Sequence, residues 1–409
     1  MGAWGCGGVW AGCLQRVKEQ GTGKSKDGEG KGMPEEEEQE EEKEALRDPA
    51  DGRFVRSFSV EDGAGAGEFF REQGFVVFRN VFSADECEKT RDAMWSLIEQ
   101  GNPGFVRGDQ RTWDEFKATG KYGLGARGPV FHPQLVRNRQ NSNLSRVLST
   151  VLGVAEDDVM VSHDRYTIYR ATHLDATLFG GSGSGSGNGR DGSRFRTGRR
   201  NVHLDLNPWW WLESSRDILV GANSLRYSDA QDFVKENNLI VASMGPHVQC
   251  VLNFADNLEQ DGGTLVVPRF HARLREWSEE HAAKLRKPVP FVTFGNAANE
   301  AAAEAALLTQ AKRVPMREGS VLVWNQTVMH GTEPNDSANT RHAQFIKAFS
   351  RAAVFAAEGS AECEGVTCAD NAARLRRRAE ALRALLAEAG AEAVVSPAGA
   401  RLFGLDVLA

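Results

Sequence analysis

The feature that most restricts the fold is a series of short apolar runs between residues 159 and 349. Each run is rich in Val, Ile, Leu, Phe or Tyr and is bounded by Gly, Pro, Asn or Asp. The runs are VMVSHDRYTIYR, NVHLDL, HVQCVLNFAD, GGTLVVP, GSVLVWN and RHAQFIKAF. Several short strands separated by turn residues, with helical patterns before and after them, are typical of a β-sandwich or roll. We therefore predict a mainly β fold with flanking helices.

Helical patterns flank the strands on both sides. Near the start of the ordered chain, EFFREQG (68–74) predicts a short helix and GFVVFRNVF (74–82) a strand. Ser83 and Glu86 form the Ser-x-x-Glu pattern of a capping box, which begins a helix that ends at Gly101. Further helices are expected over 141–152, 272–286, 297–312 and 370–389. The leucines of the last helix form one apolar stripe, so we expect it to pack on the outside with its arginines solvated.

Composition divides the chain into three parts. Residues 1–52 contain few large apolar side chains, and 34–51 hold ten acidic against two basic residues. Such a segment cannot bury enough surface to offset chain entropy, so 1–52 is predicted to be a disordered acidic tail. Residues 68–350 form the predicted main domain, with a Gly/Ser-rich insertion at 180–193. Residues 351–409 are predicted to form a C-terminal helical extension.

The charge balance and the cysteine usage restrict partners and compartment. The formal net charge is -7, but the acidic run alone accounts for -8, so the rest of the chain sums to about +1. A near-neutral folded part gives no reason to expect a nucleic-acid partner. No run of eighteen apolar residues exists, so no membrane span is expected. Six unevenly spaced cysteines and no clear targeting signal predict a cytoplasmic protein, and its oligomeric state stays open.

A candidate metal site lies in the predicted strand 201–206, where His203 and Asp205 stand one residue apart. On a strand, side chains i and i+2 project from the same face, so one imidazole and one carboxylate reach the same point. Two histidines and one carboxylate around a metal, with open positions left, are diagnostic of non-haem Fe(II) oxygenases. We expect the third ligand to be His330, at the end of the strand that begins with GSVLVWN.

One other histidine begins a similar triplet. His173 precedes Asp175 by two residues, but it leads straight into the Gly/Ser-rich insertion. His203 instead leads into a Leu-flanked strand and a Pro turn. We therefore favour His203, and we expect His173 to be structural or to lie at the rim of the pocket.

Arg341 follows His330 by eleven residues and opens the strand RHAQFIKAF. This spacing allows the chain to turn after the metal ligand and to return beside it, so the guanidinium can reach the same cavity. A buried arginine there is suited to bidentate capture of a carboxylate. The natural candidate is the distal carboxylate of 2-oxoglutarate, whose 2-oxo acid end chelates the iron.

Taken together, these motifs resemble the phytanoyl-CoA dioxygenase family of Fe(II)- and 2-oxoglutarate-dependent oxygenases. The resemblance runs roughly from Glu68 to Phe349. It rests on GFVVFRNVFSADEC, HLDLNPW, GGTLVVPRFH and GSVLVWNQTVMHG with Arg341. It implies a double-stranded β-helix, a jelly roll of the cupin kind.

The resemblance also implies roles for single residues. The implied iron ligands and catalytic residues are His203, Asp205 and His330. Arg341 is implied to anchor 2-oxoglutarate with the help of the Thr332 hydroxyl. Two positions depart from the family pattern: Ala343 stands where a Ser commonly follows the anchoring Arg, and Arg269 replaces a common Gly.

The implied reaction uses Fe(II), 2-oxoglutarate and O2, releases succinate and CO2, and hydroxylates an unidentified small or lipid-like substrate. The carboxylate of Asp205 argues against a halogenase, in which a small residue there leaves room for halide. One alternative is a non-catalytic metal-binding or regulatory protein on the same fold. Another is a cupin-type metalloenzyme that uses no oxo acid, against which the presence of Arg341 argues.

Aromatic and basic residues near the motif have two interpretations each. Trp209 to Trp211 either form an apolar wall for substrate or cap the barrel as core, and the second is favoured because large aromatics mostly pack. The basic loop GRDGSRFRTGRR is expected to be solvated, although it could attract an anionic substrate. Arg165 and Arg170 belong to the strand DRYTIYR and are expected to face the site rather than the loop, but whether they contact 2-oxoglutarate, substrate or only a buried carboxylate is left open.

Overall fold

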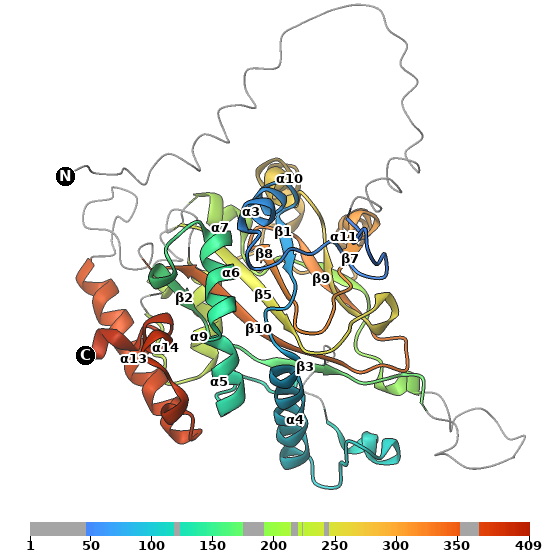
Figure 1. The fold of residues 1–409 in the computed structure, drawn as a ribbon. Coiled ribbons are helices and arrows are strands. Elements are labelled where there is room, and N and C mark those ends of the chain that lie inside the picture. Colours follow the sequence, from blue (N-terminus) through green and yellow to red (C-terminus); the bar gives the residue numbers. More distant parts are fainter. Residues whose placement is uncertain are drawn as a thin grey trace, which may run out of the picture. The chain divides into compact units, whose positions relative to one another are not determined.

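Two antiparallel sheets form the centre of the fold in the computed structural model (Figure 1). The structure describes residues 46–117, 123–174, 192–213, 220–222, 224–240, 245–351 and 368–409. The larger sheet has the order β1-β8-β5-β10-β2, and β3 also pairs with β10. Its strands are β1 (Phe75–Phe78), β2 (Val159–Val161), β3 (Tyr166–Tyr169), β5 (His247–Asn253), β8 (Val321–Asn325) and β10 (Arg341–Ser350). The smaller sheet has the order β4-β9-β6-β7, with β4 (Asn201–His203), β6 (Gly263–Val266), β7 (Lys312–Arg313) and β9 (His330–Glu333).

Helices flank both sheets. They are α3 (Gly63–Gln73), α4 (Ala84–Gly101), α5 (Pro133–Arg139), α6 (Ser142–Leu152), α7 (Pro208–Glu213), α9 (Gln231–Leu239), α10 (Phe270–Leu285), α11 (Ala298–Gln310), α13 (Cys368–Glu388) and α14 (Pro397–Leu402). Helix α6 packs on β2 and β10, α14 packs on β2, and α11 packs on β4. This confirms the predicted jelly roll with flanking helices. No helix within the described ranges combines the length and the apolar character that a membrane span requires.

Local sequence signals fix several helix ends. The predicted capping box is present: the Ser83 hydroxyl accepts from the Glu86 backbone N–H, and the Glu86 carboxylate accepts from the Ser83 N–H at 2.8 Å. Helix α6 begins after Asn141, whose side chain accepts two backbone N–H groups, and ends at Gly153 with φ 69°. Such caps satisfy backbone groups that a helix end leaves without partners. These capping residues explain why the positions of the two helices could be predicted from the sequence.

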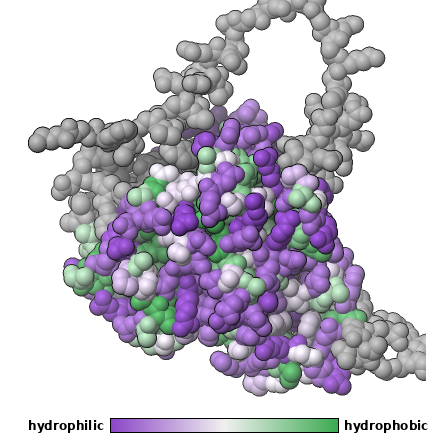
Figure 2. Space-filling model, viewed as in Figure 1, coloured by the Kyte–Doolittle hydropathy of each residue, from purple (hydrophilic) through white to green (hydrophobic). Residues whose placement is uncertain are grey.

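Two apolar clusters form the core. The larger cluster joins the larger sheet to the helices around it, and the smaller cluster lies between α7, α10 and the face of the smaller sheet that is opposite to His203 and His330. Trp209 and Trp211 belong to the smaller cluster, and Trp209 Nε1 donates to the Ser278 carbonyl at 2.8 Å. The interpretation of these tryptophans as core is therefore confirmed. The surface in Figure 2 is mostly hydrophilic, with apolar residues scattered over it.

The ordered chain begins earlier than the sequence predicted. Leu46 is already buried, and Arg47 forms a β-bridge with Val55. Arg317 pairs with Asp48 at 2.7 Å, so this segment is held by charge as well as by burial. The predicted start of order at residue 68 is wrong, because a short apolar segment and an ion pair suffice to dock it. The rest of the predicted acidic tail, and the insertion over 180–191, lie outside the described residues.

The C-terminal helix α13 contradicts one expectation. Its leucine stripe is buried as predicted, but Arg374 and Arg378 are only 1% exposed instead of solvated. Arg378 Nε pairs with Glu236 Oε2 of α9 at 2.9 Å, and Arg374 Nη1 lies 3.8 Å from Glu236 Oε1. Arginines four residues apart share one helix face, and here that face borders the apolar stripe. Glu236 could not be recognised as their partner from the sequence, because ion pairs between distant residues leave no local pattern.

Replacing Arg378 should destabilise the fold. Its loss leaves Glu236 buried with one distant cation, and breaking a buried pair costs about 3 kcal/mol or more. We expect Arg378→Ala to lower the free energy of unfolding by about that amount in urea titrations. Arg376→Ala, on the exposed side of α13, is the matched control and should change it by less than about 0.5 kcal/mol. Equal stability of the two variants would contradict a structural role for the buried pair.

Candidate metal centre

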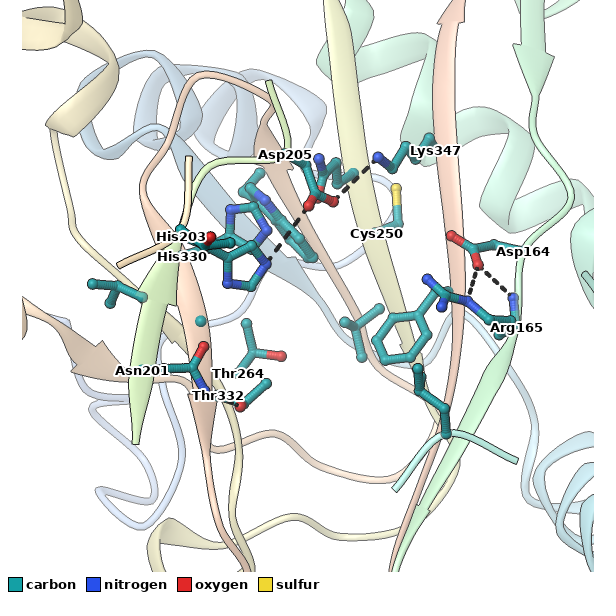
Figure 3. A pocket seen from close by; sticks show the side chains of 18 of the residues that line it. Asp164, Arg165, Asn201, His203, Asp205, Cys250, Thr264, His330, Thr332 and Lys347 are labelled. Carbon is teal, nitrogen blue, oxygen red and sulfur yellow. Dashed lines mark hydrogen bonds and ion pairs between the residues drawn. The ribbon is translucent and has the colours of Figure 1, made fainter. Parts of the chain in front are cut away.

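His203, Asp205 and His330 converge at one end of the smaller sheet (Figure 3). His203 ends β4 and His330 begins β9, and the two residues are direct partners in the antiparallel register. Their ring centroids are therefore only 4.5 Å apart. Asp205 Oδ1 lies 3.7 Å from His203 Nε2, and one ligand atom of each of the three residues lies within 4.8 Å of the others. The structure thus brings together the three residues that the sequence predicted as metal ligands.

Two details of the predicted strands are wrong. Strand β4 ends at His203, so Asp205 lies in a bend, although the backbone bridge from Leu204 to Val292 keeps the alternation of side chains. His330 does not end the strand that begins with GSVLVWN, because β8 stops at Asn325. The Asn325 carboxamide oxygen accepts from the Thr327 N–H at 2.9 Å and from its hydroxyl at 2.7 Å, which turns the chain. His330 then opens β9 in the other sheet.

Both imidazoles are in the neutral form that binds a metal ion. Burial lowers the pKa of His330 to about 3, and burial also lowers the pKa of His203, so both rings are neutral near pH 7. His330 Nδ1 lies 2.9 Å from the carbonyl oxygen of Val328. A carbonyl only accepts, so Nδ1 carries the proton and the lone pair of Nε2 is left for a metal.

Asp205 is held as a carboxylate by the charges around it. Burial opposes its ionisation, but the Lys347 ammonium group outweighs this effect and keeps the pKa of Asp205 well below its usual range. Lys347 Nζ lies 3.2 Å from Asp205 Oδ2 and 2.6 Å from Asn238 Oδ1. Among the charged groups near the carboxylate, Lys347 lowers this pKa most.

Lys347 is a residue of the site that was not predicted from the sequence. A signal was present, because a lysine inside the otherwise apolar strand FIKAF requires a buried partner. Lys347 also follows Arg341 by six residues, an even number, so both side chains project from the same face of β10. The residue that would bind it could not be recognised from spacing alone.

Arg341 lies where a carboxylate could be captured. It is 1% exposed on β10, with its guanidinium 5.0 Å from the centre of the Tyr169 ring. Arg341 Nη2 is 3.4 Å from Thr264 Oγ1, a long contact, while Nε and Nη1 have no hydrogen-bond partner among the described residues. A buried guanidinium in this state is costly unless an anion binds it. These two nitrogens fit the carboxylate that the sequence predicted here; the cavity lining itself includes the neighbouring Thr264 but not Arg341.

Thr332 lies close to this anchor but has a different partner from the one expected. Thr264, Thr332 and Asn201 are register neighbours across β6, β9 and β4. Asn201 Nδ2 donates to Thr332 Oγ1 at 3.0 Å, whereas the hydroxyl next to Arg341 is that of Thr264. Ala343, where the family commonly has Ser, is fully buried and offers no hydroxyl. Thr264 takes the position nearest the guanidinium.

Gly263 makes room for the Arg341 side chain. Its φ is 117°, and a Cβ atom built on it would lie 2.7 Å from Arg341 Nε. Only glycine adopts this backbone conformation without strain and leaves this space. Arg269, the other departure from the family pattern, adopts φ 60° at the start of α10 and pairs with Glu72 at 2.9 Å. The turn that commonly contains Gly thus keeps its left-handed geometry with Arg.

A cavity of about 460 Å³ lies between the two sheets and contains the metal cluster. Its charged and polar lining includes Lys347, Gln249, the pair Asp164 and Arg165, and the pair Arg199 and Glu304. The oxygen-to-nitrogen distances are 2.9 Å for the first pair and 2.7 Å for the second. Arg170 is instead stacked on Phe116 and Phe195, outside the lining. Of the basic loop predicted to be solvated, Arg199 lines the cavity.

His173 does not join the cluster. Its side chain is 66% exposed and lies 3.5 Å from Asp336, which is equally exposed. Asp175, its predicted partner, lies outside the described residues. Among the described residues, the one group of His, Cys, Asp and Glu side chains that could hold a metal is the cluster at His203. The geometry favours the same site as the sequence did.

Comparison with known proteins places the chain in a family. The family model described as phytanoyl-CoA dioxygenase (PhyH) matches residues 226–343. A Dictyostelium discoideum sequence described as "Putative phytanoyl-CoA dioxygenase" is 35% identical over 287 residues, which cover 69% of this chain and 74% of that relative.

Among solved structures, GlcNAc Inducible Gene 2 from Candida albicans is similar in fold, with a TM-score of 0.51 at 12% identity over 85% of this chain and 79% of that one. EctD from S. alaskensis, solved with 2-oxoglutarate and 5-hydroxyectoine, has a TM-score of 0.39 at 16% identity over 70% of this chain and 76% of that one.

The protein is therefore an oxidoreductase of the Fe(II)- and 2-oxoglutarate-dependent dioxygenase class, which uses iron, 2-oxoglutarate and O2. Within that class, the chain belongs to the phytanoyl-CoA dioxygenase family. The resemblance seen in the sequence motifs is confirmed.

Proposed function

We propose that the protein hydroxylates a small or lipid-like molecule and converts 2-oxoglutarate into succinate and CO2 in the same reaction. In this proposal His203, Asp205 and His330 hold the iron, and Arg341 holds the distal carboxylate of 2-oxoglutarate. The proposal rests on two features of the fold. One ligand atom from each of the three metal-binding residues lies within 4.8 Å of the others, and the buried Arg341 has two nitrogens without a hydrogen-bond partner.

The three side chains suit Fe(II) in number and kind. Two neutral imidazoles and one carboxylate occupy one face of an octahedral metal and leave the opposite positions open. The bound iron, together with 2-oxoglutarate and O2, supplies the oxidising power that replaces a C–H bond with C–OH. The protein contributes the orientation: the Val328 carbonyl fixes the His330 ring, and Lys347 fixes the Asp205 carboxylate.

The anchor for 2-oxoglutarate combines charge and hydrogen bonds. The guanidinium of Arg341 presents parallel N–H groups that match a carboxylate, and its burial strengthens that pairing. The hydroxyls of Thr264 and Thr332 lie on adjacent strands and line the cavity, so both can donate to the same anion. In this proposal the Thr332 hydroxyl accepts a hydrogen bond from Asn201 and donates one to the 2-oxoglutarate carboxylate.

The cavity wall supports a largely apolar substrate. A volume of about 460 Å³ is within the usual range for small-molecule sites. The apolar residues of the wall include Leu124, Val251, Phe294, Trp324 and Phe345. The arginines Arg165 and Arg199 already pair with carboxylates there, so the wall offers little uncompensated charge. An apolar molecule with a few polar groups fits such a surface best.

Anaerobic titration tests the proposal. The protein, freed of metal, is titrated with Fe(II) and then with 2-oxoglutarate, and the weak visible charge-transfer band of the chelate is followed. Air is then admitted and succinate is measured. We expect the band, followed by slow succinate formation even without substrate. Tight iron binding with neither band nor succinate would contradict the proposal and favour a non-catalytic metal-binding protein.

A further inference from the structure

We infer that Lys347 is a positioning residue that restricts the Asp205 carboxylate to one-oxygen binding of the iron and so keeps a coordination position open for 2-oxoglutarate. The inference rests on the proposed function of the metal centre. Lys347 is neither one of the three metal ligands nor the arginine anchor, and its role is inferred from its contacts with Asp205 and Asn238.

The two oxygens of Asp205 have different partners. Oδ1 faces the imidazoles, 3.7 Å from His203 Nε2, whereas Oδ2 lies 3.2 Å from Lys347 Nζ. The carboxylate is therefore divided between the metal cluster and the ammonium group. An ion pair of this kind holds the plane of the carboxylate, so Oδ1 alone is directed at the position that a metal would take.

Lys347 is itself held firmly. Its side chain is only 5% exposed, and Asn238 Oδ1 of α9 accepts from Nζ at 2.6 Å. Its backbone N–H donates to Ser162 Oγ at 2.9 Å, and its carbonyl accepts from the Ser162 N–H at 2.8 Å. On the other side it is the register partner of Gln249 in β5. Because the backbone is fixed on both sides, the ammonium group has little freedom to leave Asp205.

The open position is needed for the chemistry. A free carboxylate binds a metal through one or both oxygens, and two-oxygen binding occupies an additional position. The three protein ligands leave three positions of an octahedron, of which 2-oxoglutarate takes two and O2 the third. If Asp205 used both oxygens, one of these positions would be lost. The positive charge of Lys347 also favours an incoming dianion in this buried site.

Lys347→Met separates this role from a purely structural one, because methionine is also long and unbranched but has neither charge nor donor. We expect Fe(II) affinity to change by no more than about three-fold, since loss of orientation and loss of charge repulsion act in opposite directions. The affinity for 2-oxoglutarate, measured from the anaerobic chelate band, should fall at least about ten-fold, the usual effect of losing a group that orients a ligand. Thermal melting of the metal-free protein is measured in parallel.

Two further variants control the experiment. Lys235→Met removes a lysine of α9 that is 57% exposed and pairs with Asp232, outside the cavity lining, and it should leave 2-oxoglutarate affinity unchanged. Asn238→Ala removes one bond from the ammonium group but keeps its charge, and should weaken 2-oxoglutarate binding in the same direction by a smaller factor. Asn238→Ala also decides the question if Lys347→Met does not fold.

The outcomes distinguish the inference from the proposed function. Wild-type protein without a chelate band would overturn the proposed function and this inference with it. A normal wild-type band with unchanged 2-oxoglutarate affinity in Lys347→Met, whatever its melting temperature, would overturn the inference alone. If Lys347→Met does not fold, unchanged affinity in Asn238→Ala overturns it. A selective loss of 2-oxoglutarate affinity, with Fe(II) binding retained, would establish Lys347 as the positioning residue.

Discussion

Asp205→Ala is expected to reduce succinate formation to the level of the iron-free protein. The substitution removes one of three ligand groups, and it also leaves the Lys347 ammonium buried beside the metal position without its carboxylate. An unpaired buried cation repels a divalent metal and is itself costly. Bound iron after desalting and succinate formed in air are the two measurements, and both should be lost together.

His173→Ala is the control for this variant. His173 begins the other His-x-Asp triplet of the sequence, but its side chain is 66% exposed and lies beside Asp336. We expect it to retain iron and succinate formation. The opposite pattern, with His173→Ala inactive and Asp205→Ala active, would move the metal site to the segment around His173.

Arg341→Ala should raise the concentration of 2-oxoglutarate required for half-maximal succinate formation by about ten- to a hundred-fold. Hydrogen bonds to charged groups contribute about 1.5–3 kcal/mol, and each 1.4 kcal/mol is a factor of ten in affinity. Iron binding should stay nearly intact, because the guanidinium contacts Thr264 and Tyr169 and none of the three ligands. The anchor assignment is wrong if the co-substrate requirement does not change.

Arg199→Ala provides a matched arginine control for that experiment. Arg199 lines the cavity that contains the metal cluster, but its guanidinium already pairs with Glu304 at 2.7 Å. Its replacement should leave the 2-oxoglutarate requirement unchanged. A larger effect for Arg199→Ala than for Arg341→Ala would mean that the co-substrate carboxylate binds at the other arginine.

Local patterns in the sequence predicted most of what positions the site. The alternation around His203 and Asp205, the apolar strands and the capping box at Ser83 each depend on residues close together in the chain, and each is present in the structure. The exact end of β4 did not matter, because a backbone bridge at Leu204 preserves the side-chain alternation that the prediction used.

The features that were missed depend on partners far apart in the sequence. Lys347 is 142 residues from Asp205, and Glu236 is likewise 142 residues from Arg378. A charged residue in an apolar segment indicates that it has a buried partner, but it does not identify that partner. The same holds for Thr264, whose contact with Arg341 joins β6 of the smaller sheet to β10 of the larger sheet. Only the folded structure identifies these pairs.

The buried charges between α9 and α13 have a consequence for the order of events during synthesis. Glu236 is synthesised before Arg374 and Arg378, so α9 acquires its buried ion-pair partners only after α13 has been made. Until then, α9 has a carboxylate that cannot be buried at low cost. The same helix carries Asn238, which holds the ammonium group beside Asp205. The support that α9 gives to the ammonium group beside Asp205 therefore depends on a helix at the other end of the chain, because α13 supplies the cations that make the burial of α9 favourable.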